Sequence, residues 1–353
     1  MLAAVSGLFF SENASACTGI SLKAKDGSGV IARTMEWGGF VMDSRYVIIP
    51  RGYQQTSMLP TKEEGMKFVA KYGYAGIAVL KDNLIAEAMN EKGLIGELFY
   101  FPGYGRYEDY NPANRAQTLT DADFLAWVLG NFATVADLEK ELPNVHLAPY
   151  GQGFDTVHFR IADATGRQVV IEMLDGKFRV FENKIGIITN APSFDWQMTN
   201  LNNYVNLFAG SAGAQQVTEG VELKPFGAGS GALGLPGDLT PPSRFVRAAF
   251  YTHTAVPQAT AYGSVMQAFQ ILNNFDLPLG TEFRNSETTP DMLSATQWTT
   301  ACDIANLKFY YRTPWNSTIR CIDIKQIDFA RVKFQQGELD RVKEQPMEYI
   351  KVF

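Results

Sequence analysis

Short segments rich in β-branched residues open and close this 353-residue chain, and helical segments lie between them. Strands are predicted at 18–24, 29–35, 45–51, 66–80, 83–90, 93–101, 156–163, 168–174, 177–183, 185–190 and from 297 to the C terminus. Runs of strands and runs of helices, without strict alternation of the two, predict an α+β layered architecture. Because no repeat and no low-complexity linker interrupts the pattern, we expect one domain over residues 17–353.

The first two helical segments carry start signals. Thr120 precedes the segment 121–132, with Asp123 three residues further on, and Thr134 stands in the same way before 135–142. This spacing predicts a capping box at each helix start. Further helices are predicted at 194–208, 243–253 and 261–273, and the glycine-rich segment 209–240 is predicted to be a loop.

One cysteine, Cys17, directly follows Ala-Ser-Ala near the start of the chain. Residues 1–16 contain a short apolar run and an A-x-A pattern at Ala14 and Ala16, which is typical of a removed leader. They lack the positive start of a full secretory signal, so an abbreviated signal and a pro-segment both stay open. We expect a periplasmic or secreted protein, or a cytoplasmic one if the leader is only a pro-segment. Lipid attachment at Cys17 is a third alternative.

Composition excludes several classes of partner. The formal net charge of −6 argues against nucleic acid and against an anionic membrane surface. No apolar run approaches the ~20 residues that a membrane-spanning helix needs. The three cysteines have no C-x-x-C spacing and the three histidines are scattered, so we expect no metal site.

The position of Cys17 suggests a chemistry. If the chain is cut before Cys17, the α-amine of that residue, with an ordinary pKa of about 7.7–8.0, can act as general base for its own thiol. Nucleophile and base then belong to one residue, and no catalytic histidine is required. A cysteine kept as a small apolar core residue is the alternative, and position alone does not choose between the two.

Several stretches resemble one family in the same order along the chain. They are CTGISLKAKDG at 17–27, ARTMEW at 32–37, MNEKGLIGELFY at 89–100, IGIITNAPSFDWQMTNLNNY at 185–204 and PFGAGSGALGLPGDLTPPSRFVRA at 225–248. Together they resemble the choloylglycine hydrolase and penicillin V acylase family of N-terminal-nucleophile amidases. The resemblance implies the four-layer αββα sandwich of these hydrolases, cleavage of a linear amide in a small N-acyl substrate, and no cofactor.

The resemblance also implies catalytic roles for particular residues. Cys17 matches the nucleophile, and Arg33 matches the arginine beside the thiol, where a cation favours the thiolate. Glu36 falls where the family usually has aspartate, the residue that holds the α-amine. The carboxylate is therefore kept, with one methylene more.

Three further matches concern the reacting carbonyl group. Asn190 matches the asparagine whose side-chain amide helps to form the oxyanion hole, and Tyr100 matches the position that supplies a backbone N–H to the same hole. Arg244 matches a second arginine near the reacting centre. Without the resemblance, these residues would be interpreted as a turn residue, a core aromatic and a surface charge.

The glycine-rich stretch at 226–237 lacks the Gly-Lys-Ser/Thr of a phosphate-binding loop. Similar loops in the family take part in subunit assembly, so the resemblance implies a homotetramer.

Three functions stay open. The first is an amidase for N-acyl compounds such as penicillin V, acting through a Cys17 thioester. The second is a bile salt hydrolase or an N-acyl homoserine lactone acylase with the same residues, and the third is an exported binding protein anchored through Cys17. Penicillin V acylases of the family have tyrosine where bile salt hydrolases commonly have asparagine, so Tyr100 predicts faster hydrolysis of penicillin V than of conjugated bile salts.

Overall fold

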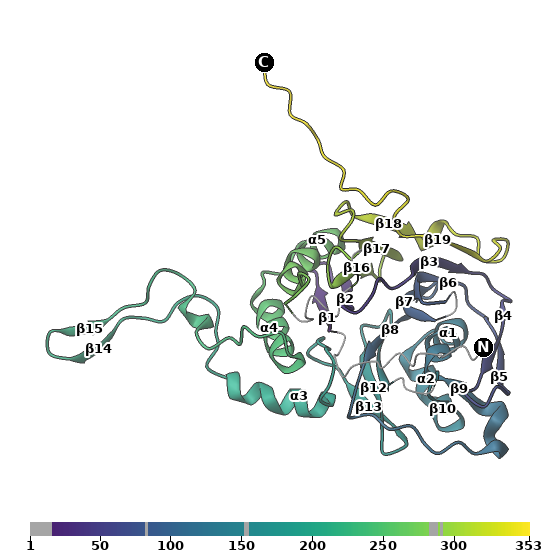
Figure 1. Cartoon of the computed structure of the whole chain (residues 1–353). Helices are drawn as coiled ribbons and strands as arrows, with labels where there is room; N and C mark the ends of the chain where they lie inside the picture. The colour runs from purple at the N-terminus through teal and green to yellow at the C-terminus, as the bar shows by residue number, and fades with distance from the viewer. Residues whose placement is uncertain (1–15, 82–83, 152–154, 282–288, 290–291) are drawn as a thin grey trace, which may run out of the picture.

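Two antiparallel β-sheets form the centre of the computed structural model, which describes residues 16–81, 84–151, 155–281, 289 and 292–353 (Figure 1). The smaller sheet has five strands in the order β1 (Cys17–Lys23), β2 (Gly29–Glu36), β16 (Thr296–Asp303), β17 (Lys308–Arg312) and β18 (Arg320–Asp323). The larger sheet has eight strands in the order β13 (Lys177–Glu182), β12 (Gln168–Leu174), β11 (Val157–Ala162), β8 (Ile95–Tyr100), β7 (Ile85–Asn90), β6 (Tyr74–Val79), β3 (Ser44–Ile49) and β19 (Gln335–Glu338). The leader predicted over 1–16 lies outside the described residues except for Ala16.

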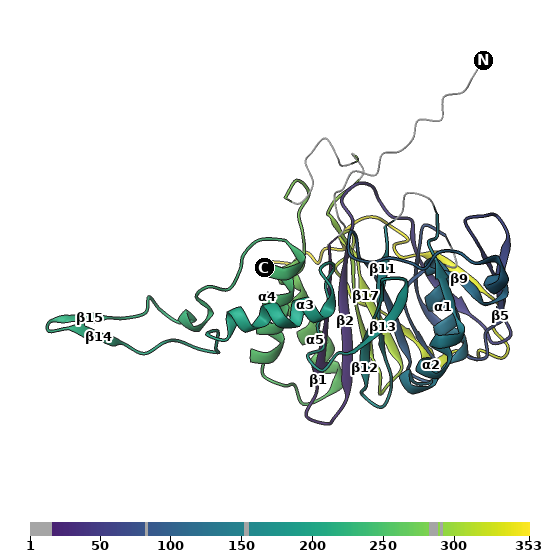
Figure 2. The same cartoon turned by 90° about the horizontal axis from the view of Figure 1, so that it is seen from below.

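Helices cover the outer face of each sheet (Figure 2). On the five-stranded sheet, α4 (Pro241–Thr254) packs against β1, and α5 (Ala261–Leu272) packs against β1, β2 and β16. On the other side, α1 (Asp121–Asn131) packs against β7 and β8, with α2 (Val135–Glu141) in the same layer. The order of layers is therefore helix, sheet, sheet, helix, which confirms the αββα sandwich that the resemblance implies.

Smaller elements surround this sandwich. The described residues include three two-stranded sheets: β4 (Gln54–Met58) with β5 (Glu64–Val69), β9 (Thr118–Thr120) with β10 (His146–Ala148), and β14 (Gln215–Thr218) with β15 (Val221–Leu223). They also include the short helix α3 (Phe194–Asn200) and the 3₁₀ turns η1 (Pro112–Gln117), η2 (Leu142–Asn144), η3 (Leu201–Tyr204), η4 (Ser230–Ala232), η5 (Asn273–Phe275) and η7 (Ile324–Gln326). None of the described helices is long and apolar enough to cross a membrane.

Two apolar clusters hold the layers together. One fills the space between the sheets and beneath α4 and α5, and the other lies between the eight-stranded sheet and the helices α1 and α2. Because successive side chains of a strand point to opposite faces, β6 contributes Ala75 and Ile77 to the first cluster and Tyr74 and Ala78 to the second. Strands covered on both faces explain why the sequence shows continuous apolar runs instead of alternation.

The start of α1 differs from the predicted capping box. The Thr120 hydroxyl donates to Asp123 Oδ2 at 2.6 Å instead of accepting a backbone N–H, and the Ser57 hydroxyl donates to the same oxygen at 2.6 Å. Asp123 is buried, so its carboxylate takes both hydroxyl groups as partners. At α2 the N-cap half of the prediction is confirmed, because Thr134 Oγ1 accepts the backbone N–H of Asp137 at 3.1 Å. The same hydroxyl donates to Asp137 Oδ2 at 2.8 Å.

The segment 185–190, predicted as a strand, meets β1 only at an isolated bridge between Gly19 and Ile188. The close approach requires glycine, because a Cβ at position 19 would lie 2.7 Å from the Ile188 side chain and 2.9 Å from that of Arg160. After this single bridge the chain leaves the sheet edge. The bridge thereby brings Asn190 alongside the start of β1.

The predicted helix at 194–208 is shorter than expected, since α3 ends at Asn200 and the 3₁₀ turn η3 ends at Tyr204. The segment 209–240, predicted as a loop, contains the hairpin of β14 and β15 and projects from the sandwich as an arm (Figures 1 and 2). After β19 the chain to Phe353 forms no strand, so the predicted closing group of strands ends at Glu338.

Candidate active site

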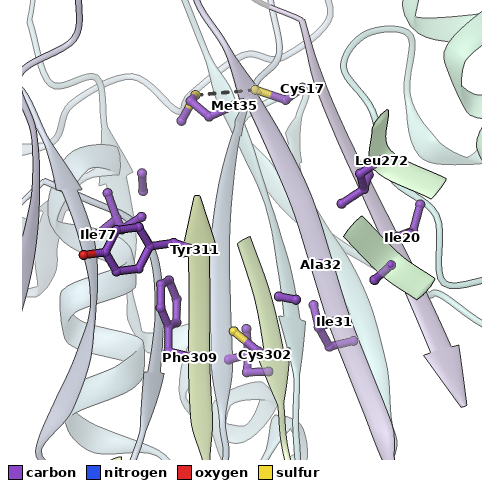
Figure 3. Packing of buried hydrophobic residues seen from close by; sticks show 14 of the residues in the cluster. Cys17, Ile20, Ile31, Ala32, Met35, Ile77, Leu272, Cys302, Phe309 and Tyr311 are labelled. Atoms are coloured by element: carbon purple, nitrogen blue, oxygen red, sulfur yellow. Dashed lines mark hydrogen bonds between the residues drawn. The ribbon is translucent and has the colours of Figure 1, made fainter. Parts of the chain in front are cut away.

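Cys17 is the first residue of β1, and it is almost completely buried. The register of the β1–β2 hairpin places it opposite Met35, and its Sγ lies 3.7 Å from Met35 Sδ. Figure 3 marks this contact with a dashed line. The short turn between the strands predicted at 18–24 and 29–35 fixes this register, so counting back along both strands could have identified Met35 from the sequence. The thiol therefore lies at one end of the edge strand β1, at the border of the apolar cluster that fills the space between the two sheets.

Asn190 joins Cys17 to two other predicted site residues. Its Oδ1 accepts the backbone N–H of Cys17 at 2.9 Å and an Arg244 Nη2 hydrogen at 2.7 Å. Its Nδ2 donates to the backbone carbonyl of Tyr100 at 2.8 Å. Because the partners of Oδ1 only donate and the Tyr100 carbonyl only accepts, they fix the orientation of the amide. The second hydrogen of Nδ2 is the one that an oxyanion would use.

Arg244, in the first turn of α4, is buried against the start of β1. Its Nη1 donates to the carbonyl oxygen of Cys17 and to Thr18 Oγ1, and its Nε donates to the carbonyl oxygen of Leu239 at 2.8 Å. A guanidinium group holds its donors in a fixed fork, so these bonds lock the position of Asn190 relative to Cys17.

Arg33, on β2, crosses the space between the two sheets. Its guanidinium lies 4.0 Å from the centre of the Phe99 ring, and its Nη1 donates to the Leu98 carbonyl at 2.6 Å. Its Nη2 lies 3.9 Å from Met35 Sδ, the same sulfur that contacts Cys17. In the described contacts, Arg33 therefore reaches the Cys17 thiol only indirectly, through the Met35 sulfur.

Glu36 ends β2 beside the peptide bond that joins Ala16 to Cys17. Its backbone N–H donates to the Ala16 carbonyl at 3.0 Å, and the Thr296 hydroxyl donates to its Oε1 at 3.4 Å. The side chain is fully buried. Thr296 pairs with Glu36 across β16 and β2, and nothing in the sequence connects two residues so far apart.

Burial raises the pKa of the Cys17 thiol above its ordinary value. The positive charge of Arg33 opposes this rise, and the charge of Glu36 adds to it; a backbone N–H of Glu36 and the charge of Arg244 also lower the pKa. The resemblance implied that Arg33 favours the thiolate, and its effect has that sign, but burial outweighs it. The thiol therefore keeps its proton at neutral pH and depends on a nearby base.

The side chain of Tyr100 belongs to an aromatic wall made of Trp37, Phe40 and Tyr100. Trp37 meets both other rings edge to face, with centroid distances of 5.7 Å to Phe40 and 5.9 Å to Tyr100. The Tyr100 hydroxyl donates to Asp155 Oδ2 at 2.9 Å, and burial together with this carboxylate raises the pKa of the phenol. Tyr100 therefore stays neutral, and the wall offers an apolar surface.

The other two cysteines lie away from this site. Cys302 is buried on β16 with its Sγ 3.5 Å from Glu87 Oε1, and Cys321 is exposed on β18. Among the residues that the structure describes, no group of three or more His, Cys, Asp or Glu side chains could hold a metal ion.

Glu36→Gln is expected to lower kcat/KM for an amide substrate by about ten- to hundredfold, the range for losing a hydrogen bond to a charged group. The reason is that the charge of the buried Glu36 carboxylate acts on Cys17, so neutralising it changes the electrostatics around a free amine there. Glu36→Asp should keep substantial activity. Glu139→Gln, which removes a carboxylate paired with Arg167 far from Cys17, is the control. Equal kcat/KM in wild type and Glu36→Gln would show that the charge is not part of the site.

Comparisons with known proteins identify a family and several similar hydrolases. The family model described as linear amide C–N hydrolases, choloylglycine hydrolase family, matches residues 17–337. A bile salt hydrolase/transferase from Clostridium perfringens is 32% identical over 316 residues, covering 88% of this chain and 93% of that protein. A penicillin V acylase from Pectobacterium atrosepticum is 27% identical, covering 88% of this chain and 81% of that protein. The crystal structure of a mutant conjugated bile acid hydrolase from C. perfringens superposes with a TM-score of 0.79 and 29% identity, covering 95% of this chain and 100% of that one.

Proposed function

The chain belongs to the choloylglycine hydrolase family of linear amide C–N hydrolases, and on that premise we propose that it hydrolyses the amide bond of conjugated bile salts with Cys17 as the nucleophile. The bile salt substrate is supported by the relatives, because the bile salt hydrolase of C. perfringens is more similar to this chain than the penicillin V acylase of P. atrosepticum, at 32% against 27% identity. The observation that carries the mechanism is the bonding of the Cys17 nitrogen to an amide that Arg244 and Tyr100 hold in place.

The mechanism requires removal of residues 1–16. With Ala16 attached, the Cys17 nitrogen is a peptide N–H that donates to Asn190 Oδ1 and has no basic lone pair. A free amine at the same place keeps a hydrogen for Asn190 and gains a lone pair for the thiol proton. Because burial raises the pKa of the thiol, this internal base is what makes the sulfur reactive.

The reaction then proceeds in two steps. Cys17 Sγ forms a bond to the amide carbon while its proton passes to the α-amine, and the carbonyl electrons move to oxygen. The oxyanion is stabilised by Asn190 Nδ2 and the backbone N–H of Tyr100. The C–N bond breaks, the α-ammonium gives its proton to the leaving amine, and a thioester remains. Water attacks the thioester, which releases the carboxylic acid and restores the thiol.

The aromatic wall favours a second candidate substrate, penicillin V. An edge-to-face contact between one of its rings and a phenoxy group is worth about 0.5–1.5 kcal/mol beyond the area buried. That is at most about tenfold in affinity, so the wall biases the choice of substrate without deciding it. The hydroxyl-free face of a bile acid nucleus is also apolar, so an apolar wall does not discriminate against that substrate.

In the chain that begins at Cys17 we expect a higher kcat/KM for glycine- or taurine-conjugated bile salts than for penicillin V. This reverses the prediction from Tyr100 alone, because the similarity to bile salt hydrolases extends over most of the chain. Tyr100→Asn should lower kcat/KM for penicillin V by up to about tenfold, because the ring contact is lost. Tyr104→Asn, at a residue that is 54% exposed, is the matched control. A clear preference for penicillin V would favour the second candidate and leave the cysteine mechanism intact.

Export and assembly complete the proposal. Removal of the leader on export to the periplasm or beyond would supply the free Cys17. The arm exposes Leu223, Phe226 and Leu233, and we propose that a homotetramer covers these side chains.

A further inference from the structure

A buried histidine and a buried glutamate lie behind Asn190. His158 of β11 has its Nδ1 3.0 Å from Glu172 Oε1 on β12, and its Nε2 lies 3.0 Å from the carbonyl oxygen of Thr189. The ring stacks on Phe101, with centroids 4.4 Å apart and planes 12° apart. Both side chains of the pair are withdrawn from solvent, with 2% and 0% exposure.

The bonds of this pair fix the number of its protons. A backbone carbonyl only accepts, so Nε2 of His158 carries a hydrogen toward Thr189. Glu172 Oε1 also accepts the backbone N–H of Phe194, at 2.9 Å. The contact between Nδ1 and Oε1 is then a hydrogen bond only if one further proton lies between them. The pair is neutral overall, whether that proton resides on the imidazole or on the carboxyl group.

The pair holds both ends of the segment that carries Asn190. Thr189 immediately precedes Asn190, and Phe194 is the first residue of α3. We infer that His158 and Glu172 are positioning residues for Asn190, and that their shared proton is required for hydrolysis. The inference rests on the proposed function, because it assigns Asn190 to the oxyanion.

Other charged groups around the pair lie on β11 itself, on the neighbouring elements β8, β13, α3 and α4, and at Asp155 just before β11. Arg160 lies two residues further along β11 and is ion-paired to Glu97 of β8, and Arg179 of β13 is the exposed cross-strand partner of Glu172. Asp155 accepts the Tyr100 hydroxyl, Asp195 of α3 accepts the Ser193 hydroxyl, and Arg244 of α4 binds Asn190. The direct partners of the His158 ring nitrogens remain Glu172 and the Thr189 carbonyl.

The decisive variant is Glu172→Gln. If the glutamine oxygen takes the Oε1 position, it still accepts the backbone N–H of Phe194. It can then accept from His158 Nδ1 only when both ring nitrogens carry a hydrogen, which makes His158 a buried cation without a counter-charge. If the glutamine nitrogen takes that position, it faces the Phe194 N–H, and that bond is lost. The arrangement that keeps the bonds to Phe194, to His158 Nδ1 and to Thr189 therefore needs a second proton on His158, and this proton is lost as the pH rises. We expect the alkaline side of the kcat–pH profile to move to lower pH, so that the ratio of kcat at pH 6 to kcat at pH 8 rises at least about tenfold over wild type.

His158→Asn gives an independent measurement. The asparagine amide still reaches Glu172 but is too short to reach the Thr189 carbonyl, and it does not titrate. We expect kcat to fall at both pH values by about the same factor, with KM little changed. The imidazole proton signal shifted downfield by the Glu172 bond should be present in wild-type spectra and absent in both variants.

Glu108→Gln is the matched control. His146 and Glu108 form another histidine–carboxylate pair, with Nδ1 and Oε1 2.8 Å apart, that is partly buried and away from Cys17. This variant should keep the wild-type kcat ratio between the two pH values. If folded Glu172→Gln has the same ratio of kcat at pH 6 to kcat at pH 8 as the wild type, the inference is overturned. It is also overturned if Glu108→Gln changes this ratio as much as Glu172→Gln does.

If Glu172→Gln does not fold, the test falls to His158→Asn. A kcat of this variant equal to that of the wild type overturns the inference. Hydrolysis by the wild type is measured first, with any amide that it cleaves. A mature wild type without amidase activity refutes the proposed function, whereas an active one with unaltered variants refutes only the positioning role.

Discussion

Cys17→Ala is expected to abolish amide hydrolysis and to leave the fold intact. The sulfur is the atom that forms the thioester, so its removal should lower kcat by at least about a thousandfold, as for other covalent nucleophiles. The side chain contributes a contact with Met35 Sδ to the core, and alanine removes that contact without placing a polar group there. We therefore expect a thermal unfolding midpoint within a few degrees of wild type.

Cys17→Ser should also lose nearly all turnover. A serine hydroxyl is far less acidic than a thiol, and burial already raises the pKa of the thiol at this position. Cys321→Ser is the matched control, because Cys321 is exposed on β18 and should tolerate the change with full activity.

The measurement is kcat on mature protein whose N-terminal mass has been determined. A free N-terminal cysteine fits the amidase, whereas an acylated cysteine or an uncut leader fits the anchored binding protein. More than a few per cent of wild-type hydrolysis in purified Cys17→Ala would exclude the cysteine mechanism.

Local patterns predicted the parts of the site that depend on local structure. The strands predicted at 18–24 and 29–35 pair as the β1–β2 hairpin, whose register places Cys17 opposite Met35. The position of β1 at the edge of its sheet was not predicted. The helix starts at Thr120 and Thr134 were also predicted. The cap at Thr120 was wrong because the hydroxyl of Ser57, distant in sequence, competes for Asp123.

The parts that the sequence did not reveal depend on distant contacts. Thr296 reaches Glu36 only because β16 pairs with β2, and no local pattern marks that pairing. The hairpin in the arm consists of short, exposed strands, so it lacks the apolar signal by which strands are predicted. The resemblance supplied candidate residues, whereas the burial that raises the pKa of Cys17 became visible only in the folded chain.

Asn190 illustrates both sources of information. The resemblance selected it. The position of Asn190 depends on Gly19, because the bridge between Gly19 and Ile188 leaves no room for a side chain at position 19. Gly19 was part of the matched stretch, but its reason for being glycine appears only when the loop lies against the strand.

Asn190→Ala is expected to lower kcat by about 10²–10³-fold, equivalent to about 2.7–4 kcal/mol, which is the range for removal of one oxyanion donor. It removes the Nδ2 donor, and it also removes the Oδ1 acceptor shared by the Cys17 nitrogen and Arg244. KM should change by less than kcat, because the oxyanion forms only as the thiol attacks.

Asn190→Asp separates the two functions of the side chain. The carboxylate keeps acceptors for the Cys17 nitrogen and for Arg244, but it supplies no donor. In place of Nδ2, which donates to the Tyr100 carbonyl at 2.8 Å in the wild type, it turns an oxygen toward that carbonyl. If the donor matters most, Asn190→Asp should lose as much kcat as Asn190→Ala. Asn131→Ala, which removes a partly buried side-chain bond to the Trp127 carbonyl in α1, is the control for loss of an amide contact. More than a tenth of wild-type kcat in Asn190→Ala would remove this residue from the oxyanion hole, and full activity in Asn190→Asp alone would assign it to the amine of Cys17 instead.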